Sequence, residues 1–393
     1  MSNFSYYTPT HVYFGRGTQN QVGELVRAQG CKKVLIHYGG QSARRSGLLV
    51  QVEASLDAAG VAHVQLGGVV PNPHLSLVYE GIELCRREGV DFILAVGGGS
   101  VIDSAKAIGY GMCMDGDVWE LYNHTRRAAG CLPIGVILTI AASGSEMSDS
   151  SVITKEEGGI KRGYNDDLCR PKFAIMNPEL TMTLPDYQTA CGCTDILMHT
   201  MERYFVQGDA MEITDSIAEA LMRTVMEQAK ILRDDPKNYD ARAEVMWAGS
   251  LSHNGLTGCG HDGSDFASHR LEHEMGGMFD VAHGAGLAAV WGSWARYVYQ
   301  NCMPRFVRFA RNVMGVEAEL SDDAAALRGI ELMEDFFRSI HMPTCFSELG
   351  IHPTQEQLEE MAHKCYLAVG GLLGSAKKLD EGDMLAIYKM ANH

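Results

Sequence analysis

The feature that most constrains the fold is an alternation of short apolar strands and helical stretches in the first half of the chain. Lys33–Tyr38 and Phe92–Val96 are largely apolar runs that end at glycines and precede segments with helical periodicity. Further strands are expected at Phe4–Phe14, which is aromatic and β-prone, at Val61–Leu66 and at Ile134–Leu138. Apolar strands separated by helices are typical of a parallel sheet with helices on both faces. The first half is therefore predicted to be an α/β domain.

After Leu184 the strand pattern gives way to long amphipathic stretches. Because their apolar residues recur with a helical period, we expect helices at Gln188–Phe205, Glu212–Leu232, Tyr239–Asn254, Gly263–Met275, Ala285–Met303, Ala324–Ile340 and Gln355–Leu367. A length of 393 residues suggests two or three domains. The predicted organisation is an α/β nucleotide-binding domain over residues 1–184 and an all-helical metal-binding domain over residues 185–393.

A glycine run, Gly97-Gly98-Gly99-Ser100, joins the Phe92–Val96 strand to a helix expected from Val101. Glycines let the backbone approach a diphosphate, and the free N–H groups of the helix N-terminus face the anion. A tight strand–helix turn without a ligand is the alternative. The run lacks the usual dinucleotide fingerprint and follows the third strand, which argues against an ordinary Rossmann domain.

A second candidate loop follows the Ile134–Leu138 strand. Its small hydroxyl residues, from Thr139 to Ser143-Gly-Ser-Glu146, are suited to contact a nicotinamide or a phosphate. Asp103 and Lys161 are the ionisable residues near the two loops, and a surface ion pair is the alternative for each.

Histidines and a carboxylate recur at helical spacing in the second half. Asp195 and His199 are four residues apart, as are His269 and His273, and His283 follows. Residues i and i+4 lie on one face of a helix, so each pair can aim at one point. Imidazoles with a carboxylate suit a divalent first-row metal ion. For any one of these histidines alone, a satisfied core residue is the alternative.

Composition excludes several classes of partner. The net charge of −16 argues against nucleic acid and anionic membranes. No apolar run is long enough to span a membrane, and residues 1–9 lack the pattern of a signal peptide. The eleven cysteines are scattered, which indicates reduced thiols and a cytoplasmic protein.

Together these motifs resemble the iron-containing (group III) alcohol dehydrogenases. The resemblance rests on Gly97-Gly-Gly-Ser100-x-x-Asp103, Ser143-Gly-Ser-Glu146, Asp195-x3-His199 and His269-x3-His273-x9-His283-Gly284. Tyr38-Gly-Gly-x-Ser42 and Pro71-Asn-Pro73 are most similar to the butanol dehydrogenase and aldehyde reductase branch. The resemblance covers nearly the whole chain. It implies a dehydroquinate synthase-like fold with a cleft between the domains, and a homodimer that pairs N-terminal strands.

The resemblance also implies roles for individual residues. The implied metal ligands are Asp195, His199, His269 and His283. The implied catalytic residues are His273, as a nearby proton relay that does not bind the metal, with Asp103 and Lys161. The cofactor is expected against Gly39, Gly40, Ser42, Asn72, Gly97, Gly98, Gly99, Ser100, Asp103, Thr139, Ser148 and Lys161. Glu272 and Glu274 are either acceptors that orient the imidazoles or, as the favoured interpretation, exposed helix charges.

The cofactor preference has its own argument. No Asp or Glu stands between Glu24 and Glu53, whereas Ser42, Arg44 and Arg45 do. Without an acid that binds the ribose diol, NADP is favoured over NAD. The bulk of Gln41, where the family more often has glycine, opposes this choice.

The implied metal is Fe²⁺, and the ligand chemistry admits Zn²⁺ or Ni²⁺ as well. The expected activity is hydride transfer between a short-chain primary alcohol or aldehyde and NAD(P). A metal- and NAD-dependent lyase or cyclase of the dehydroquinate synthase type is the alternative enzyme. A metal or nucleotide sensor without catalysis is the non-enzyme alternative.

Overall fold

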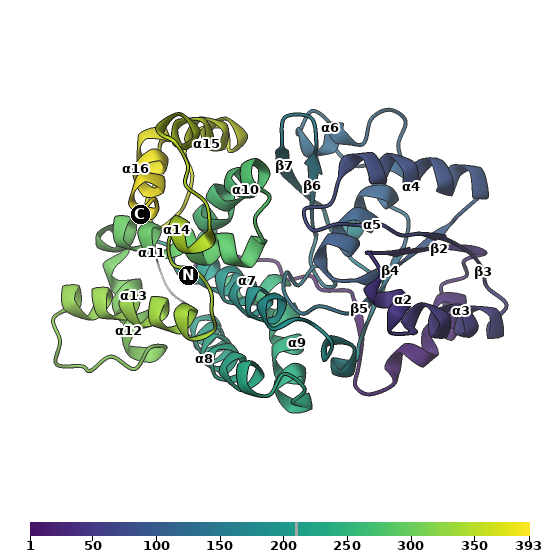
Figure 1. Ribbon diagram of the computed structural model, residues 1–393, viewed down its shortest axis with the longest axis horizontal. Helices are drawn as coiled ribbons and strands as arrows, with labels where there is room; N and C mark the ends of the chain where they lie inside the picture. Colours follow the sequence, from purple (N-terminus) through teal and green to yellow (C-terminus); the bar gives the residue numbers. More distant parts are fainter. Residues whose placement is uncertain (209–210) are drawn as a thin grey trace. The chain divides into compact units, whose positions relative to one another are not determined.

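The computed structural model describes residues 1–208 and 211–393 (Figure 1). The chain forms two compact units, Thr8–Thr183 and Leu184–His393, and the second includes Met1–Tyr7. These first residues, expected with the α/β domain, group with the helical unit, where the backbone N–H of Ser2 donates to the carbonyl of Gly260 at 3.0 Å. The predicted fold class, a parallel-sheet domain followed by a helical domain, is confirmed.

A six-stranded parallel sheet forms the centre of the α/β unit, in the order β1-β8-β5-β4-β2-β3. Its strands are β1 (His11–Phe14), β2 (Lys33–Tyr38), β3 (Ala62–Leu66), β4 (Phe92–Gly97), β5 (Ile134–Leu138) and β8 (Phe173–Met176). A separate antiparallel hairpin pairs β6 (Ser150–Lys155) with β7 (Ile160–Asn165). Since the sheet is parallel, the segments that follow β2, β4 and β5 all start on the same side of it, where the carboxyl ends of the strands lie.

The sequence prediction missed three of these strands. β8 has only four residues, and the hairpin strands lack a clear apolar alternation. The N-terminal strand, expected over Phe4–Phe14, begins only at His11.

Helices cover both faces of the sheet (Figure 1). α1 (Val22–Ala28) and α3 (Leu48–Ala58) lie on one face, while α4 (Leu75–Glu88) and α5 (Gly99–Met112) lie on the other. Two shorter helices are α2 (Ser42–Arg45) and α6 (Trp119–Tyr122). One core cluster joins sheet and helix side chains that are fully buried, including Val34, Ile36, Val52, Leu56, Phe92 and Leu94. Burial of each such side chain contributes about 1.5–3 kcal/mol.

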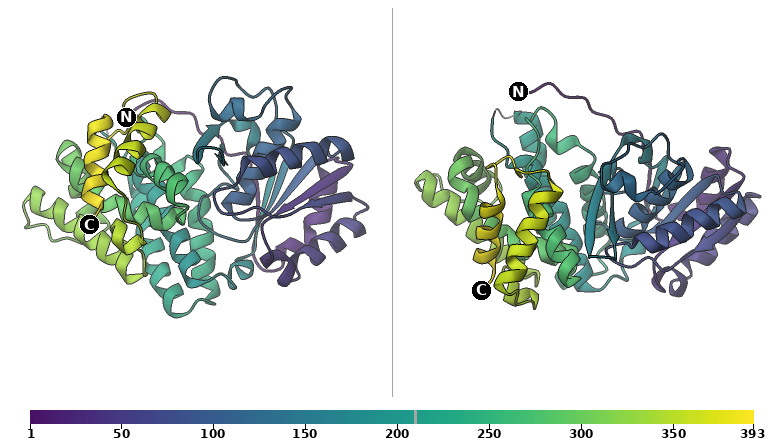
Figure 2. Two further views of the ribbon diagram at one scale, coloured as in Figure 1. Left: turned by 45° about the horizontal axis from the view of Figure 1, so that its top comes forward. Right: turned by 90° about the horizontal axis from the view of Figure 1, so that it is seen from above.

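The helical unit is built around α7 (Asp186–Tyr204), labelled in Figure 1, which packs against four other helices. Figure 2 shows the helices of this unit from two further directions. These are α8 (Glu212–Asp234), α9 (Tyr239–His253), α10 (Ala267–Phe279) and α11 (His283–Val298). The remaining helices are α12 (Met303–Asn312), α13 (Asp322–Ser339), α14 (Phe346–Leu349), α15 (Gln355–Ala368) and α16 (Glu381–Ala391).

The helix boundaries that differ most from the prediction are those of α11 and α10. The stretch expected at Ala285–Met303 ends at Val298, and a new helix starts at Met303 with Pro304 in its first turn, where proline is tolerated. The helix expected from Gly263 starts at Ala267, because Phe266 has a left-handed backbone with φ of 51°.

Two further findings concern the described residues. No helix there has the length and apolarity that a membrane crossing would require. All eleven cysteines lie in the described part, and none forms a disulfide.

Candidate metal and cofactor sites

One face of α7 carries Asp195, His199 and Glu202, which are spaced by four and then three residues. All three side chains are buried, at 1–5% exposure. Nδ1 of His199 lies 3.2 Å from Oδ1 of Asp195 and donates to the main-chain carbonyl of Asp195 at 3.0 Å. The predicted i,i+4 pair therefore meets inside the protein.

α10 and α11 bring two more imidazoles to the same carboxylate. Nε2 of His269, near the start of α10, lies 3.4 Å from Asp195 Oδ1. Nε2 of His283, the first residue of α11, lies 3.7 Å from the same oxygen. The side chain of His283 is 29% exposed, so it is the most open of the three histidines. The four residues predicted as ligands thus gather around one oxygen atom.

Gly284 makes this approach possible. A Cβ atom at Gly284 would lie 2.2 Å from the main-chain oxygen of Cys191 on α7. No L side chain fits so close to a backbone atom, so the N-terminus of α11 can rest on α7 only with glycine here. Cys191 precedes Asp195 by one helical turn. The glycine that follows His283 therefore sets how close His283 comes to the carboxylate.

Each imidazole has an acceptor for its Nδ1 proton. His269 donates from Nδ1 to Oε2 of Glu202, and its main-chain N–H donates to Oε1 at 2.9 Å. Nδ1 of His283 lies 2.5 Å from Oε2 of Glu272. An acceptor on Nδ1 fixes the tautomer and leaves Nε2 for a metal ion.

The burial of the glutamates near the cluster differs from what the sequence suggested. Glu272 and Glu274 are 0% and 4% exposed, so the favoured interpretation of exposed helix charges was wrong. Glu202 was missed. Its spacing from Asp195 and His199 on one helix face was the available signal, but its partner His269 lies 67 residues away.

In this cluster, burial and neighbouring charged groups shift the pKa values in opposite directions. Burial disfavours ionisation of Asp195, but His199, His283 and His269 outweigh it and hold the pKa of Asp195 below its usual range. Burial lowers the pKa of His199 well below its ordinary value. Burial also opposes protonation of His269, yet Glu202 and Asp195 raise its pKa to about 9. A metal ion at this cluster would compete with protons, because its ligands must be deprotonated.

The cluster fits a divalent cation. Ligand atoms of Asp195, His199 and His269 lie within 4.8 Å of one another. Asp195 Oδ1 and His269 Nε2 are buried atoms without a hydrogen-bond partner among the described residues. Buried polar atoms are rarely left in this state, since each costs stability. A cation bound by nitrogen and oxygen donors would satisfy both atoms.

Two further histidines border the cluster. The ring of His273 lies 6.0 Å from that of His283 and 6.5 Å from that of His269, between centroids. The ring of His253 lies 4.0 Å from that of His199, and its Nδ1 accepts from Arg203 at 3.0 Å. The sequence singled out His273 but not His253, which comes from a different helix.

The predicted phosphate loop joins β4 to α5. Cβ atoms at Gly98 and Gly99 would lie 2.9 Å from the side chain of Ile140 and 2.2 Å from Oγ of Ser143. The glycines therefore permit close packing against the loop after β5. No side chain caps the N-terminus of α5. A helix start without a cap has N–H groups that suit an anion such as a diphosphate.

Other residues predicted to face the cofactor lie in the same unit. The N–H of Thr139 donates to the carbonyl of Gly97 at 3.0 Å, which ties the two loops together. Ser148 is fully buried, and Lys161 lies on β7 at 5% exposure. Asp103 accepts from Ser145 Oγ at 2.6 Å and from the N–H of Val152 at 3.0 Å. These bonds give Asp103 a role in holding the loop.

The segment after β2 carries Gly39, Gly40 and Ser42. Gly40 and Ser42 are exposed. Arg44, one of the arginines expected near a 2′-phosphate, donates from Nε to Tyr38 Oη at 3.0 Å and stacks on that ring. Asn72 adopts a left-handed backbone with φ of 55°.

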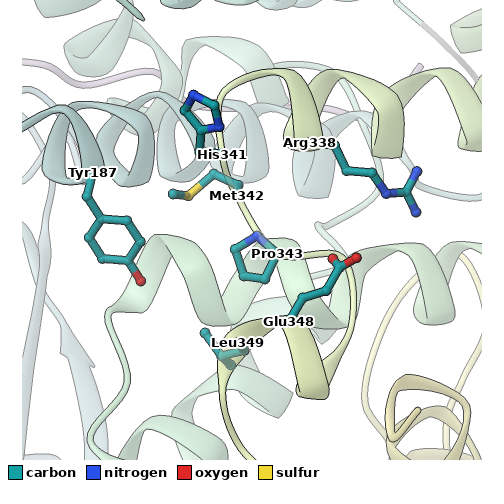
Figure 3. A pocket seen from close by; sticks show the side chains of 7 residues that line it. All are labelled: Tyr187, Arg338, His341, Met342, Pro343, Glu348 and Leu349. Carbon is teal, nitrogen blue, oxygen red and sulfur yellow. The ribbon is translucent and has the colours of Figure 1, made fainter.

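A pocket of about 260 Å³ lies elsewhere in the helical unit (Figure 3). Tyr187 of α7 faces residues 338–349 across it. Its charged groups bond within the chain, since Arg338 donates to Thr344 Oγ1 at 3.0 Å and Glu348 accepts from the Thr344 N–H at 2.7 Å. None of the predicted ligands lines this pocket.

Comparison with known proteins covers both halves of the chain. Residues 9–178 match the model of the family described as iron-containing alcohol dehydrogenase. Residues 189–392 match the C-terminal model of the Fe-containing alcohol dehydrogenase family.

Individual relatives extend over the full length. NADH-dependent butanol dehydrogenase A of Clostridium acetobutylicum is 38% identical over 99% of both chains. The NADPH-dependent aldehyde reductase YqhD of Escherichia coli is 34% identical over 89% of this chain and 90% of its own. The crystal structure of NADH-dependent butanol dehydrogenase A from Thermotoga maritima superposes with a TM-score of 0.96, at 37% identity over 100% of this chain and 99% of that one. The chain is therefore a member of the iron-containing alcohol dehydrogenase family.

Proposed function

We propose that the chain is a metal-dependent, NAD(P)-linked alcohol dehydrogenase or aldehyde reductase for short-chain primary alcohols and aldehydes. The observation that carries this proposal is the cluster of Asp195, His199, His269 and His283, in a chain of this family. Within it, Asp195 Oδ1 and His269 Nε2 are buried without a hydrogen-bond partner among the described residues. Full-length relatives are named as butanol dehydrogenases and an aldehyde reductase. For this reason a lyase or cyclase of the dehydroquinate synthase type is not favoured.

The proposed roles follow from the chemistry of the residues. Asp195, His199, His269 and His283 would hold the metal, and residues 97–100 would hold the diphosphate. A bound divalent cation would supply Lewis acidity toward the substrate oxygen, and the cofactor would accept or donate the hydride. His273 relays the proton, since an imidazole titrates near neutral pH and this one borders the ligands. Asp103 and Lys161 stay predicted catalytic residues.

The preference for NADP over NAD stays a prediction based on the absence of an acid near Ser42 and Arg45. Two observations oppose it. Arg44 is already bonded to Tyr38, and the relatives at 38% identity are named NADH-dependent. The value of kcat/KM for NADPH divided by that for NADH decides the question. A quotient above one supports the prediction, and a quotient below one contradicts it.

Fe²⁺ is the proposed metal on the basis of the family, with Zn²⁺ or Ni²⁺ able to occupy the same donors. We also propose a cytoplasmic homodimer. β1 is an edge strand whose last residue, Phe14, is 40% exposed, and Tyr7, which precedes the strand, is 55% exposed. An open strand edge with exposed aromatic side chains is suited to pair with a second copy.

The test is oxidation of NADPH or NADH with butanal, followed at 340 nm, together with elemental analysis of the protein. Wild-type protein is expected to oxidise the cofactor and to lose activity when a chelator removes the metal. His283→Ala is expected to lose both metal and activity. Full activity of a metal-free protein would overturn the proposal, and conversion of substrate without net redox change would favour a lyase.

A further inference from the structure

Lys106, in the third turn of α5, is a cation with no exposed surface. Removing an ammonium group from water is costly unless its N–H groups are bonded. An ammonium has three donors. The position of Lys106 is therefore stable only if suitable acceptors are held around it.

Those acceptors come from the loop between β5 and β6 and from Ser150, the first residue of β6. Nζ of Lys106 lies 2.8 Å from the carbonyl of Ser145, 3.0 Å from that of Ser148 and 2.7 Å from that of Ser150. The hydroxyls of Ser145 and Ser148 lie at 3.0 and 3.4 Å. The ammonium thus occupies a cage of neutral oxygens, of the kind that also suits a monovalent cation.

Asp103, one turn earlier on α5, holds the same loop at further points. Its carboxylate accepts from Ser145 Oγ at 2.6 Å and from the Val152 N–H at 3.0 Å, while its main-chain carbonyl accepts from Ser151 Oγ at 2.9 Å. Ser145 therefore bridges the carboxylate and the ammonium. Residues 139–149 contain no helix or strand, so these bonds to α5 define the shape of the loop.

The first turn of α5 contacts the same loop. Gly98 and Gly99 pack closely against Ile140 and Ser143, as described above. The two segments predicted to hold the cofactor, residues 97–100 and 139–148, are thus both fixed by one helix. Lys106 supplies the only charged donor among the described contacts between α5 and this loop.

We propose that Lys106 is a positioning residue for the nicotinamide cofactor. Its ammonium fixes residues 145–150 relative to the phosphate loop, so cofactor affinity depends on a side chain that has no surface to touch the cofactor. The inference rests on the proposed function, in which these two segments bind NAD(P).

The first test is Lys106→Met, which keeps most of the apolar stem and removes the charge. We expect the Kd for NADPH or NADH, measured by cofactor fluorescence, to rise at least about tenfold, corresponding to loss of one charge-assisted hydrogen bond. KM for the cofactor is expected to rise, with kcat, KM for butanal and metal content nearly unchanged. Wild-type cofactor affinity in this variant would overturn the inference, even if its melting temperature fell.

Chemical rescue separates positioning from general stability. Lys106→Ala removes the atoms that n-propylammonium contains, so this ion is expected to restore cofactor affinity. Tetramethylammonium, which has no N–H group, is the matched control and is expected to have no effect. Equal rescue by both ions, or by neither, would contradict a role for the ammonium in positioning.

A milder variant keeps the test valid if both lysine variants fail to fold. Ser145→Ala removes the hydroxyl bridge and leaves the main-chain acceptor, so a Kd increase of about two- to tenfold is expected. An unchanged Kd would count against the inference. If wild-type protein binds neither NADPH nor NADH, the proposed function fails as well, whereas normal binding by wild type and variants alike defeats only the role of Lys106.

Discussion

The proposed metal-ligand cluster of the helical unit and the predicted cofactor loops of the α/β unit hold their functional groups by different means. In the cluster, charged side chains of Glu202 and Glu272 orient imidazoles that surround the carboxylate of Asp195. In the α/β unit, the ammonium of Lys106 is surrounded by neutral loop oxygens. Metal affinity at the cluster should therefore be sensitive to changes in charge and helix packing. Cofactor affinity at the loops should be sensitive to changes that remove the hydrogen bonds holding their backbone.

Buried histidines show the same difference. His269 lies beside two carboxylates, and its pKa is raised to about 9 against the effect of burial. Among the described residues, the ring nitrogens of His37, on β2, bond to neutral groups, the carbonyl of Leu66 and Oγ of Ser104, each at 2.9 Å. Burial lowers the pKa of His37 to about 4. The carboxylates beside His269 thus favour its protonated form, whereas burial among neutral groups favours the neutral form of His37.

The largest effect is expected from Gly284→Ala. The added Cβ would meet the main-chain oxygen of Cys191 at 2.2 Å, and no rotamer change relieves a backbone contact. α11 must move, and His283 moves with it away from Asp195. We expect loss of bound metal in elemental analysis and a destabilisation of about 1–3 kcal/mol or more. Cofactor affinity, which depends on the other unit, should stay close to that of wild type.

Gly382→Ala in α16 is the matched control, because its Cβ would have only the side-chain oxygen of Asp380 nearby, at 3.3 Å. This variant should bind metal as wild type does. Normal metal content in Gly284→Ala would mean that the contact between α11 and α7 does not shape the ligand cluster.

A smaller effect is expected from Glu202→Gln. The amide retains the size of the carboxylate but removes the charge that orients His269, so metal affinity should fall about 10- to 100-fold. Chelator competition with Zn²⁺ measures this change. Glu227→Gln on exposed α8 surface is the control. Unchanged metal affinity in Glu202→Gln, or an equal loss in the control, would refute the proposed role of Glu202.

The smallest effect concerns the pH dependence contributed by His37. Its folded pKa, about 4, lies below the ordinary value of 6.5, so below pH 6.5 the unfolded chain gains a proton that the folded chain does not bind. The contribution of His37 to stability is present above pH 6.5 and is lost as pH falls toward 4, by up to about 3 kcal/mol. Replacing His37 should therefore reduce the loss of stability on acidification.

Thermal unfolding of His37→Gln at pH 7 and pH 4.5 tests this prediction. We expect the variant to be less stable than wild type at pH 7, because the two hydrogen bonds of His37 are altered. The difference in stability between variant and wild type should narrow at pH 4.5. Exposed His352→Gln should show a constant, small difference at both pH values. If the stability difference between wild type and His37→Gln stays constant or widens on acidification, the lowered pKa of His37 is contradicted.

How far the sequence predicts this molecule also differs between the two regions. The strand–helix alternation and the i,i+4 pairs at Asp195 and His269 are local patterns, and they predict the parallel sheet and the residues that gather at the cluster. Glu202 and Lys106 were missed, because their partners lie 67 and about 40 residues away and depend on tertiary packing. β8 was missed because four apolar residues carry no period.

The central claim is that Asp195, His199, His269 and His283 bind one metal ion. Anomalous diffraction at the absorption edge of the bound metal tests it directly. We predict a single strong peak bonded to one atom of each of these side chains, at about 2.0–2.2 Å. A peak at another set of residues, or no peak in protein that elemental analysis shows to be loaded, would contradict the claim.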